Sequence, residues 1–184
     1  MYAKEMWIQS LPLLVVCGIG AILAGNTLSA MADILEEIPG LIVIIPAVIA
    51  MRGNISTALG SRLGSAYHLG IINKDNLWNE DLKQNMKGSL LLSLIMSFLI
   101  GILAYISSLF FNVSPNPLQL ICIVVIAGVL SGLILIALTV AIIYLVFKRG
   151  YDPDNVTGPA LATFGDIITM LCLFGSAVFV GGIL

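Results

Sequence analysis

The stretch that decides the fold runs from Gly88 to Phe147 and reads GSLLLSLIMSFLIGILAYISSLFFNVSPNPLQLICIVVIAGVLSGLILIALTVAIIYLVF. It contains no Lys, Arg, Asp or Glu, although an α-helix needs only about 20 apolar residues to cross the hydrocarbon of a membrane. The turn NVSPNP divides the stretch, because its prolines stop one helix and start the next. It therefore predicts two membrane-spanning helices, at about 89–111 and 118–147.

The rest of the 184-residue chain has the same character. The whole chain is 59% hydrophobic and 10% charged, with a mean hydropathy of +1.09, which is outside the range of ordinary soluble domains. The backbone must be paired internally in lipid, and the apolar runs lack the alternation of barrel strands. We expect one all-α, polytopic membrane domain over residues 1–184, with five transmembrane helices at about 7–30, 39–72, 89–111, 118–147 and 155–183.

Two of these helices need comment. The first apolar segment is longer than the apolar region of a cleaved signal peptide, so we expect it to be a retained helix. The second, at 39–72, would be about 50 Å long at 1.5 Å per residue and must tilt, break or protrude into water. The sequence MRGN at 51–54 is expected to interrupt it.

The cysteines have no paired spacing and no nearby His, so we interpret them as small buried hydrophobes: Cys17, Cys122 and Cys172.

The basic residues predict an orientation. With five spans, the N-terminus and the connections after the second and fourth helices share one side, and no Lys or Arg lies outside the helices on the other. The positive-inside rule then makes the N-terminus cytoplasmic and the C-terminus external in a cell membrane. The external connection between the first two helices is either an ordinary solvated loop or a cation-attracting mouth, and it holds Asp33, Glu36 and Glu37. The cytoplasmic basic residues are Lys4, Lys74, Lys83, Lys87, Lys148 and Arg149.

Two charges remain deep in apolar sequence, Arg52 and Asp166. Asp166 lies twelve residues beyond Asp154, about 18 Å by helical rise, near the middle of a roughly 30 Å hydrocarbon core. A carboxylate there costs several kcal/mol unless it meets water, a cation or a partner. One interpretation is a structural or assembly subunit in which Asp166 pairs with Arg52, or is protonated. The other is a cation site in a water-filled pathway.

The last helix carries further polar groups that favour the pathway. Threonines stand three positions on either side of Asp166, an asparagine lies three turns below on a similar face, and two aspartates mark the cytoplasmic start. Pro159 cannot donate to the carbonyl four residues before it, which frees that oxygen to face water or an ion. We therefore interpret the helix as pore-lining, through Asp152, Asp154, Asn155, Thr163 and Thr169.

The second helix supplies small and polar residues. Its small residues allow either close packing between helices or pore lining. Asn54 can offer an amide oxygen to a cation or to its hydration water. Arg62 is expected to extend to the cytoplasmic interface, and the lone His68 is an interfacial residue rather than a metal ligand. The small residues form two rows, Gly53, Thr57, Ser61 and Ser65 beside Ser56, Gly60 and Gly64.

Two motifs carry a resemblance to a known family: PAVIAMRGNISTALGSRL at 46–63 and DPDNVTGPALATFGD at 152–166. The chain resembles the MgtE-type magnesium transporters, and most closely the repeat unit of solute carrier family 41. The resemblance implies a divalent-cation pathway between two five-helix units related by a two-fold axis. It also implies that Asp166 is the central pore carboxylate, Asp152 its cytoplasmic counterpart, and Asn54 the asparagine of a Gly-Asn motif.

The sequence also departs from this family. Bacterial members carry no charge around the position of Arg52, so the charge looks closer to the solute carrier branch and argues against unhindered channel-like conduction. Bacterial members also have a large cytoplasmic magnesium-sensing region, and we expect no gating by that route here. Solute carrier members hold two units in one chain. This sequence shows no internal repeat, so a homodimer is expected.

We therefore expect transport of divalent cations, with Mg²⁺ the best candidate and Mn²⁺, Co²⁺ or Ca²⁺ as alternatives. Oxygen ligands suit a hydrated Mg²⁺, and the scarcity of soft ligands argues against copper or zinc. One His and no metal-ligand cluster argue against an enzyme, and the lack of a basic tract argues against nucleic acid. The expected partners are a second copy of the chain, membrane lipid and the cation. The expected metal ligands are Asp166, Asp152 and Asp154, and the expected pathway residues are Asn54, Arg52, Thr57, Asn155 and Thr163.

Overall fold

The computed structural model describes residues 2–72, 78–149 and 153–183, without the side chains of residues 2–6, 8–10, 13, 147, 149 and 153–156. All regular structure in this part of the chain is helical. Four helices are long and apolar enough to cross a membrane, α3 to α6, and an earlier helix contributes a shorter apolar segment, Leu14–Ala30. The helices are α1 (Tyr2–Ala30), α2 (Ala32–Glu37), α3 (Leu41–His68), α4 (Glu80–Phe110), α5 (Pro117–Arg149) and α6 (Pro153–Gly181).

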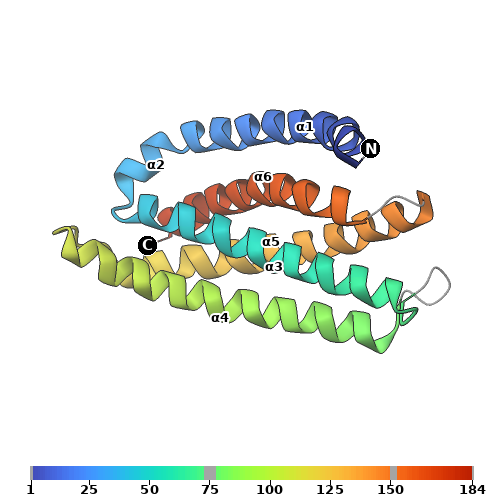
Figure 1. Cartoon of the computed structure of the whole chain (residues 1–184). Coiled ribbons are helices and arrows are strands. Elements are labelled where there is room, and N and C mark those ends of the chain that lie inside the picture. The colour runs from blue at the N-terminus through green and yellow to red at the C-terminus, as the bar shows by residue number, and fades with distance from the viewer. Residues whose placement is uncertain (1, 73–77, 150–152, 184) are drawn as a thin grey trace.

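The long helices run up and down between two ends of the molecule (Figure 1). The start of α1, the end of α3, the start of α4 and the junction of α5 with α6 lie at one end, as five alternating spans require. Helices α3, α4, α5 and α6 form a bundle, with α5 between α4 and α6, and α1 packs along α6. The expected all-α, multi-pass architecture is confirmed. Which end faces the cytoplasm stays a prediction.

The connection between α1 and α3 is more ordered than expected, because residues 32–37 form the short helix α2. All three acidic residues of this connection are exposed in the single chain. The chain then turns at Gly40, whose φ of +84° is a left-handed conformation that favours glycine. A Cβ atom there would also lie 2.7 Å from the Ser108 hydroxyl of α4. This glycine therefore sets both the turn and the contact with α4.

Helix α3 ends at His68, so the expected end at residue 72 is wrong. The reason is a glycine-based helix terminus. Gly70 has a φ of +73°, its N–H donates to the Tyr67 carbonyl at 2.9 Å, and the Ile71 N–H donates to the Ala66 carbonyl at 2.9 Å. These two hydrogen bonds satisfy carbonyl groups at the C-terminus of the helix, and the chain then leaves the helix axis.

The expected interruption at residues 51–54 is also wrong, because α3 is continuous there. Glycine in a helix costs only about 1 kcal/mol relative to alanine, which is less than an unpaired backbone group costs in lipid. The Thr57 hydroxyl donates to the Gly53 carbonyl at 2.8 Å, on the same helix. The low helix propensity of MRGN is therefore overridden by the medium.

Helix α4 begins at Glu80, nine residues before the expected start at 89. Asn79 caps it, since its side-chain oxygen accepts from the Leu82 N–H at 2.9 Å. Glu80 and Asp81 occupy the first turn, where the helix dipole favours negative charge. A polar sequence thus continues the membrane helix into water. The other expected helices agree with α1, α5 and α6 to within a few residues at most ends.

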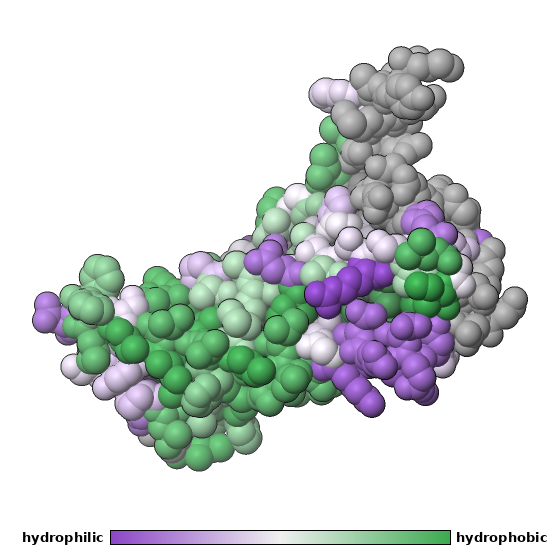
Figure 2. Space-filling view, turned by 60° about the horizontal axis from the view of Figure 1, so that its bottom comes forward, coloured by the Kyte–Doolittle hydropathy of each residue, from purple (hydrophilic) through white to green (hydrophobic). Residues whose placement is uncertain are grey.

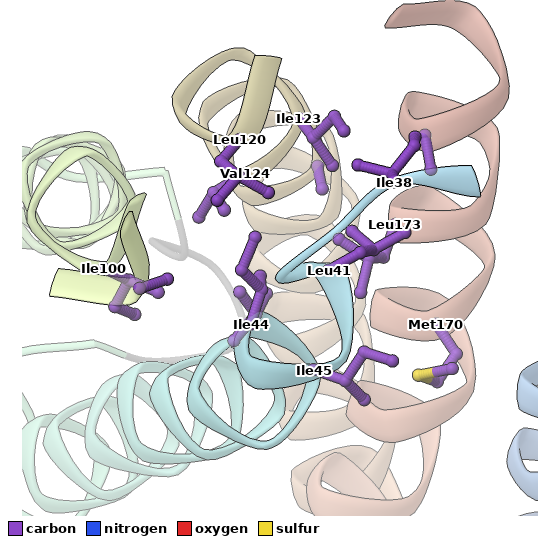
Figure 3. Packing of buried hydrophobic residues seen from close by; sticks show 14 of the residues in the cluster. Ile38, Leu41, Ile44, Ile45, Ile100, Leu120, Ile123, Val124, Met170 and Leu173 are labelled. Carbon is purple, nitrogen blue, oxygen red and sulfur yellow. The ribbon is translucent and has the colours of Figure 1, made fainter. Parts of the chain in front are cut away.

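Apolar side chains fill the bundle in two clusters. The larger one lies toward the end that contains α2. There Ile44 of α3 points toward α4 and α5, while Ile45 points toward Met170 of α6 (Figure 3). The smaller cluster joins α3, α4 and α5 near the other end and consists of Leu59, Leu63, Ile72, Leu82, Ile136, Val140 and Ile143.

The contact between α4 and α5 generates the first prediction. A Cβ atom on Gly101 would lie 2.9 Å from the Ile121 Cα atom, and backbone cannot move aside cheaply. Gly101→Ala should therefore lower the free energy of unfolding by about 1–3 kcal/mol. Gly88 lies on the same helix with no atom within 4 Å of its Cβ position. Gly88→Ala is the matched control, and should be neutral or stabilise by up to about 1 kcal/mol.

Unfolding of the purified variants in detergent, followed by circular dichroism during a denaturant titration, measures both changes. Equal effects of the two substitutions would contradict the close α4–α5 contact.

Candidate functional site

Arg52 is the most deeply buried charge that the structure describes. It lies between the two apolar clusters and is 1% exposed. Its guanidinium enters a set of small residues from α4 and α5, which we call the serine–glycine layer. The Nη1 group donates to the Ser93 hydroxyl at 2.6 Å, whereas Nε and Nη2 have no hydrogen-bond partner. The serine–glycine layer consists of Ser93, Ser97, Gly128 and Gly132.

The two glycines of α5 make room for this group. A Cβ atom on Gly132 would lie 2.6 Å from the Arg52 Nη1 atom. A Cβ atom on Gly128 would overlap the Ser97 hydroxyl. The side chain of Arg52 thus requires close approach of α3, α4 and α5.

Arg52 does not pair with Asp166 in this structure. Among the side chains described, the ion pair present is Lys83–Glu80, which is exposed and lies at the start of α4. The alternative of a buried Asp–Arg pair is therefore wrong for the single chain. The three cysteines, expected to be buried, are partly buried, and Cys122 packs against the larger apolar cluster.

Asp166 lies at the middle of α6. Thirteen residues of the helix precede it and fifteen follow, about 20 Å on either side by helical rise. The residue is half-buried. Its carboxylate makes no hydrogen bond or ion pair with any residue that the structure describes. An intramembrane carboxylate with no protein partner is expensive, so Asp166 is the group most in need of a ligand.

Helix α1 covers one side of α6 near this depth. Gly20 of α1 allows the contact, because a Cβ atom there would overlap the methyl group of Thr163. The Thr163 hydroxyl donates to the Pro159 carbonyl at 3.0 Å, and the Cys17 thiol donates to the same oxygen at 3.4 Å. Thr163 thus lies at the α1–α6 contact and its hydroxyl is already engaged.

Helix α3 flanks α6 on the other side. Gly60 of α3 packs against Leu161, since a Cβ atom there would lie 3.0 Å from the leucine side chain. The two helices are antiparallel, so the five residues from Leu161 to Asp166 on α6 correspond to five residues back along α3, at about Ile55 and its neighbour Asn54. Asn54 is exposed, and no atom lies within 4 Å of a Cβ position on Gly53. The structure thus brings Asn54 and Asp166 to one depth, beside an open face of the chain.

Arg52 and Asn54 point to different sides of α3. They are two positions apart, which separates side chains by about 200° around a helix. Arg52 is buried and Asn54 is exposed. Thr57 is half-buried beside the same open face, with its hydroxyl bonded to its own helix. Of the expected pathway residues, Asn54 and Thr57 lie on the open side, and Arg52 does not.

Two buried threonines on α6 have hydroxyls without a partner. They are Thr169, which is fully buried, and Thr157, which is 7% exposed. Thr157 contacts Gly60, since a Cβ atom on that glycine would lie 3.1 Å from its methyl group. Thr157 is not among the residues expected from the sequence to line the pathway. Its position is evident only from its contact with Gly60, and the sequence around Thr157 gives no sign of that contact.

Comparison with known proteins identifies the family. Residues 45–176 match the MgtE family, described as a divalent cation transporter. This chain belongs to the MgtE family. The family resemblance expected from the two motifs is confirmed. MgtE is a family of transporters rather than a class of enzymes, and the four long apolar helices make this member a multi-pass membrane protein.

The MgtE chain is also similar to curated solute carriers. It is 28% identical over 182 residues to solute carrier family 41 member 2 of Gallus gallus, covering 91% of this chain and 30% of that protein. The identity to the Homo sapiens member 2 is 27% with the same coverage. The identity to member 3 of Rattus norvegicus is 25% over 165 residues, covering 85% of this chain and 35% of that protein. The chain thus spans about a third of the length of these relatives.

Part of the expected MgtE site falls outside what the structure describes. Asp152 lies outside the described residues, as do the side chains of Asp154 and Asn155, so the acidic cytoplasmic mouth stays a prediction. Among the described residues, no group of three or more His, Cys, Asp or Glu could hold a metal ion. The described part of one chain therefore offers a single mid-membrane carboxylate, Asp166, rather than a complete cage.

The contact of Arg52 with Ser93 generates the second prediction. Ser93→Ala leaves a further buried donor unpaired and should lower the free energy of unfolding by about 1–3 kcal/mol. The matched control is Ser108→Ala, because that buried hydroxyl donates only to the Ala104 carbonyl of its own helix. In an Arg52→Met background, Ser93→Ala should cost much less, since no guanidinium remains to be satisfied.

Denaturant titration of the two single variants and the double variant gives the coupling energy of the cycle. Additive effects of Ser93→Ala and Arg52→Met would contradict the hydrogen bond as the basis of this contact.

Proposed function

We propose that this protein transports divalent cations, with Mg²⁺ as the preferred ion, along a pathway formed between two copies of the chain. The observation that carries the proposal is the carboxylate of Asp166, which lies at mid-membrane without a protein partner in a member of the MgtE family. Asp166 from each copy faces the shared axis and holds the ion at the centre of the pathway.

A cation is the ligand that best stabilises this carboxylate. A buried carboxylate can be neutralised by a proton, by a cationic side chain or by an ion. Arg52, the buried cationic side chain in this part of the bundle, donates to Ser93 and points away from the open face of α3. The half-exposed position of Asp166 gives access to water, so a hydrated cation can reach it.

The available ligands favour Mg²⁺. This ion gives up water reluctantly and is usually held by one or two carboxylates, with several waters retained. Two copies of Asp166, with the amide oxygens of Asn54 at the same depth, offer that ligand set without soft donors. Thr57 lies beside this face. Pathway roles for Asp152, Asp154, Asn155 and Thr163 are part of the same proposal. Manganese and other divalent ions would compete less well.

The second copy is proposed because one chain leaves the site open. Asn54 is exposed and no described atom lies within 4 Å of a Cβ position on Gly53, and homo-oligomers commonly have closed symmetry. A two-fold axis along this face doubles every ligand and encloses the ion. The basic residues Lys83, Lys87 and Lys148 lie toward the end where α1 begins, so we propose that this end is cytoplasmic.

Loss of the carboxylate is the third prediction. Asp166→Asn removes the charge with little change in shape and should lower Mg²⁺ flux into proteoliposomes at least tenfold, equivalent to about 1.4 kcal/mol in the barrier. Glu80→Gln, an exposed acidic residue at the start of α4, is the matched control and should keep normal flux. Elution volume and thermal unfolding show whether each variant is folded. Unchanged flux in folded Asp166→Asn protein would contradict the central site.

The shared pathway gives the fourth prediction. Wild-type and Asp166→Asn chains are unfolded and refolded together, or expressed together, at several ratios and then reconstituted. If both carboxylates act in one pathway, flux should fall roughly as the square of the wild-type fraction, because mixed dimers are impaired. A linear fall, with each chain transporting independently, would overturn the two-copy pathway while leaving Asp166 as a site.

A further inference from the structure

A cleft of about 340 Å³ opens between the end of α3 and the start of α4, within the range of roughly 300–1,000 Å³ that is typical of ligand pockets. It lies away from the Asp166 carboxylate, near the end of the molecule where the connection between α3 and α4 is found. Polar and apolar side chains share its wall. The lining residues are Ser61, Arg62, Ser65, Ala66, Leu69, Ile71, Asp81 and Asn85.

Opposite charges face this cleft without neutralising each other. Arg62 of α3 and Asp81 of α4 both line it, yet they form no ion pair within the described part of the chain. Both residues are exposed. Two separated charges of opposite sign match a ligand that carries both an anionic and a cationic group.

Hydrogen-bonding groups stand beside each charge. The hydroxyls of Ser61 and Ser65 lie one turn apart on α3, on the side of Arg62, and can donate to phosphate oxygens. Asn85 stands one turn after Asp81, and its amide nitrogen donates to the Asp81 carbonyl at 2.9 Å. The amide oxygen of Asn85 is therefore left as an acceptor beside the Asp81 carboxylate. The cleft offers phosphate donors on one wall and ammonium acceptors on the other.

The surroundings place the cleft at the membrane surface. The uncharged part of α4 begins at Gly88, one turn beyond Asn85. Leu69 and Ile71, on the rim, are 74% and 46% exposed, and Trp78 beside α4 is 66% exposed, as is typical of side chains at a lipid interface. Figure 2 shows hydrophilic surface bordered by hydrophobic surface on the face that carries α4. A ligand with an apolar tail can thus enter from the bilayer.

Specific hydrogen bonds fix the rim of the cleft. Gly70 turns the chain at the end of α3, and the Asn79 amide nitrogen donates to the Ile71 carbonyl at 2.8 Å. The same asparagine caps α4 through the Leu82 N–H. One side chain thus holds the two walls at a fixed separation.

We propose that this cleft binds the headgroup of a phospholipid with a primary ammonium group, of the phosphatidylethanolamine class. Arg62 and the two serines hold the phosphate, and Asp81 with Asn85 accepts hydrogen bonds from the ammonium group. A quaternary ammonium cannot donate these bonds, so phosphatidylcholine lacks half of the contacts. The proposal is independent of the transport function.

Native mass spectrometry of the purified protein tests this with lipids of matched acyl chains. Wild-type protein should retain phosphatidylethanolamine at least about fivefold better than phosphatidylcholine. Equal retention of the two would overturn the proposal, and this comparison needs no variant. Stronger retention of phosphatidylglycerol than of phosphatidylethanolamine would also overturn it, because the glycerol headgroup has no ammonium group for Asp81. Soluble phosphoethanolamine should not displace the lipid at equal concentration, and efficient displacement would overturn a lipid as the source.

Variants assign the two ends of the headgroup. Asp81→Asn should abolish the preference for phosphatidylethanolamine over phosphatidylcholine but leave the retention of phosphatidylcholine unchanged. Arg62→Gln should reduce retention of both lipids. Glu80→Gln and Lys87→Gln are the matched controls, because these exposed charges lie on the same part of α4 but do not line the cleft. A preference that survives Asp81→Asn, or is lost equally in Glu80→Gln, would overturn the assignment.

Discussion

The burial of the Arg52 guanidinium is the constraint on which much of this bundle depends. A charge at mid-membrane costs about 2.5–3.5 kcal/mol on insertion scales, and Arg52 donates one hydrogen bond, to the Ser93 hydroxyl. The group must therefore be enclosed by protein rather than lipid. This enclosure requires small residues on α4 and α5 at the same depth, which the serine–glycine layer supplies, and it fixes the approach of three helices between two apolar clusters.

The same constraint decides what faces the open side of α3. Because the Arg52 side chain packs between α4 and α5, helical geometry places Asn54 on the opposite side of α3. Gly60 then sets α3 against α6 in a register that brings Asn54 to the depth of Asp166. The one buried cation of this region is thus held away from the mid-membrane carboxylate. Arg52 of α3 therefore does not neutralise Asp166, whose carboxylate stays available to a ligand.

The sequence could predict what depends on local composition and on the medium. Long apolar runs predicted the spans, and the helical position of Asp166 gave its depth. Helix ends were missed where they depend on single residues, such as Gly70 in a left-handed turn and Asn79 as a cap. The surroundings of Arg52 could not be predicted, since its hydrogen bond joins residues 41 positions apart. Likewise, only the structure shows that Thr163 lies against α1, because Gly20 comes from the far end of the chain.

Apolar clusters form within one chain, whereas several polar groups lack a partner among the described residues. The larger hydrophobic cluster joins Ala24 of α1 and Met31 to the long helices, and the smaller one joins α3, α4 and α5. Asp166, and separately Arg62 and Asp81, are charged groups that form no ion pair among the described residues. In water such groups are satisfied by solvent, but at or within a membrane they select what binds there. The ligand that we propose at mid-depth is a small hydrated cation. The ligand that we propose at the interface is a headgroup that carries both charges, so the two proposed sites differ in depth.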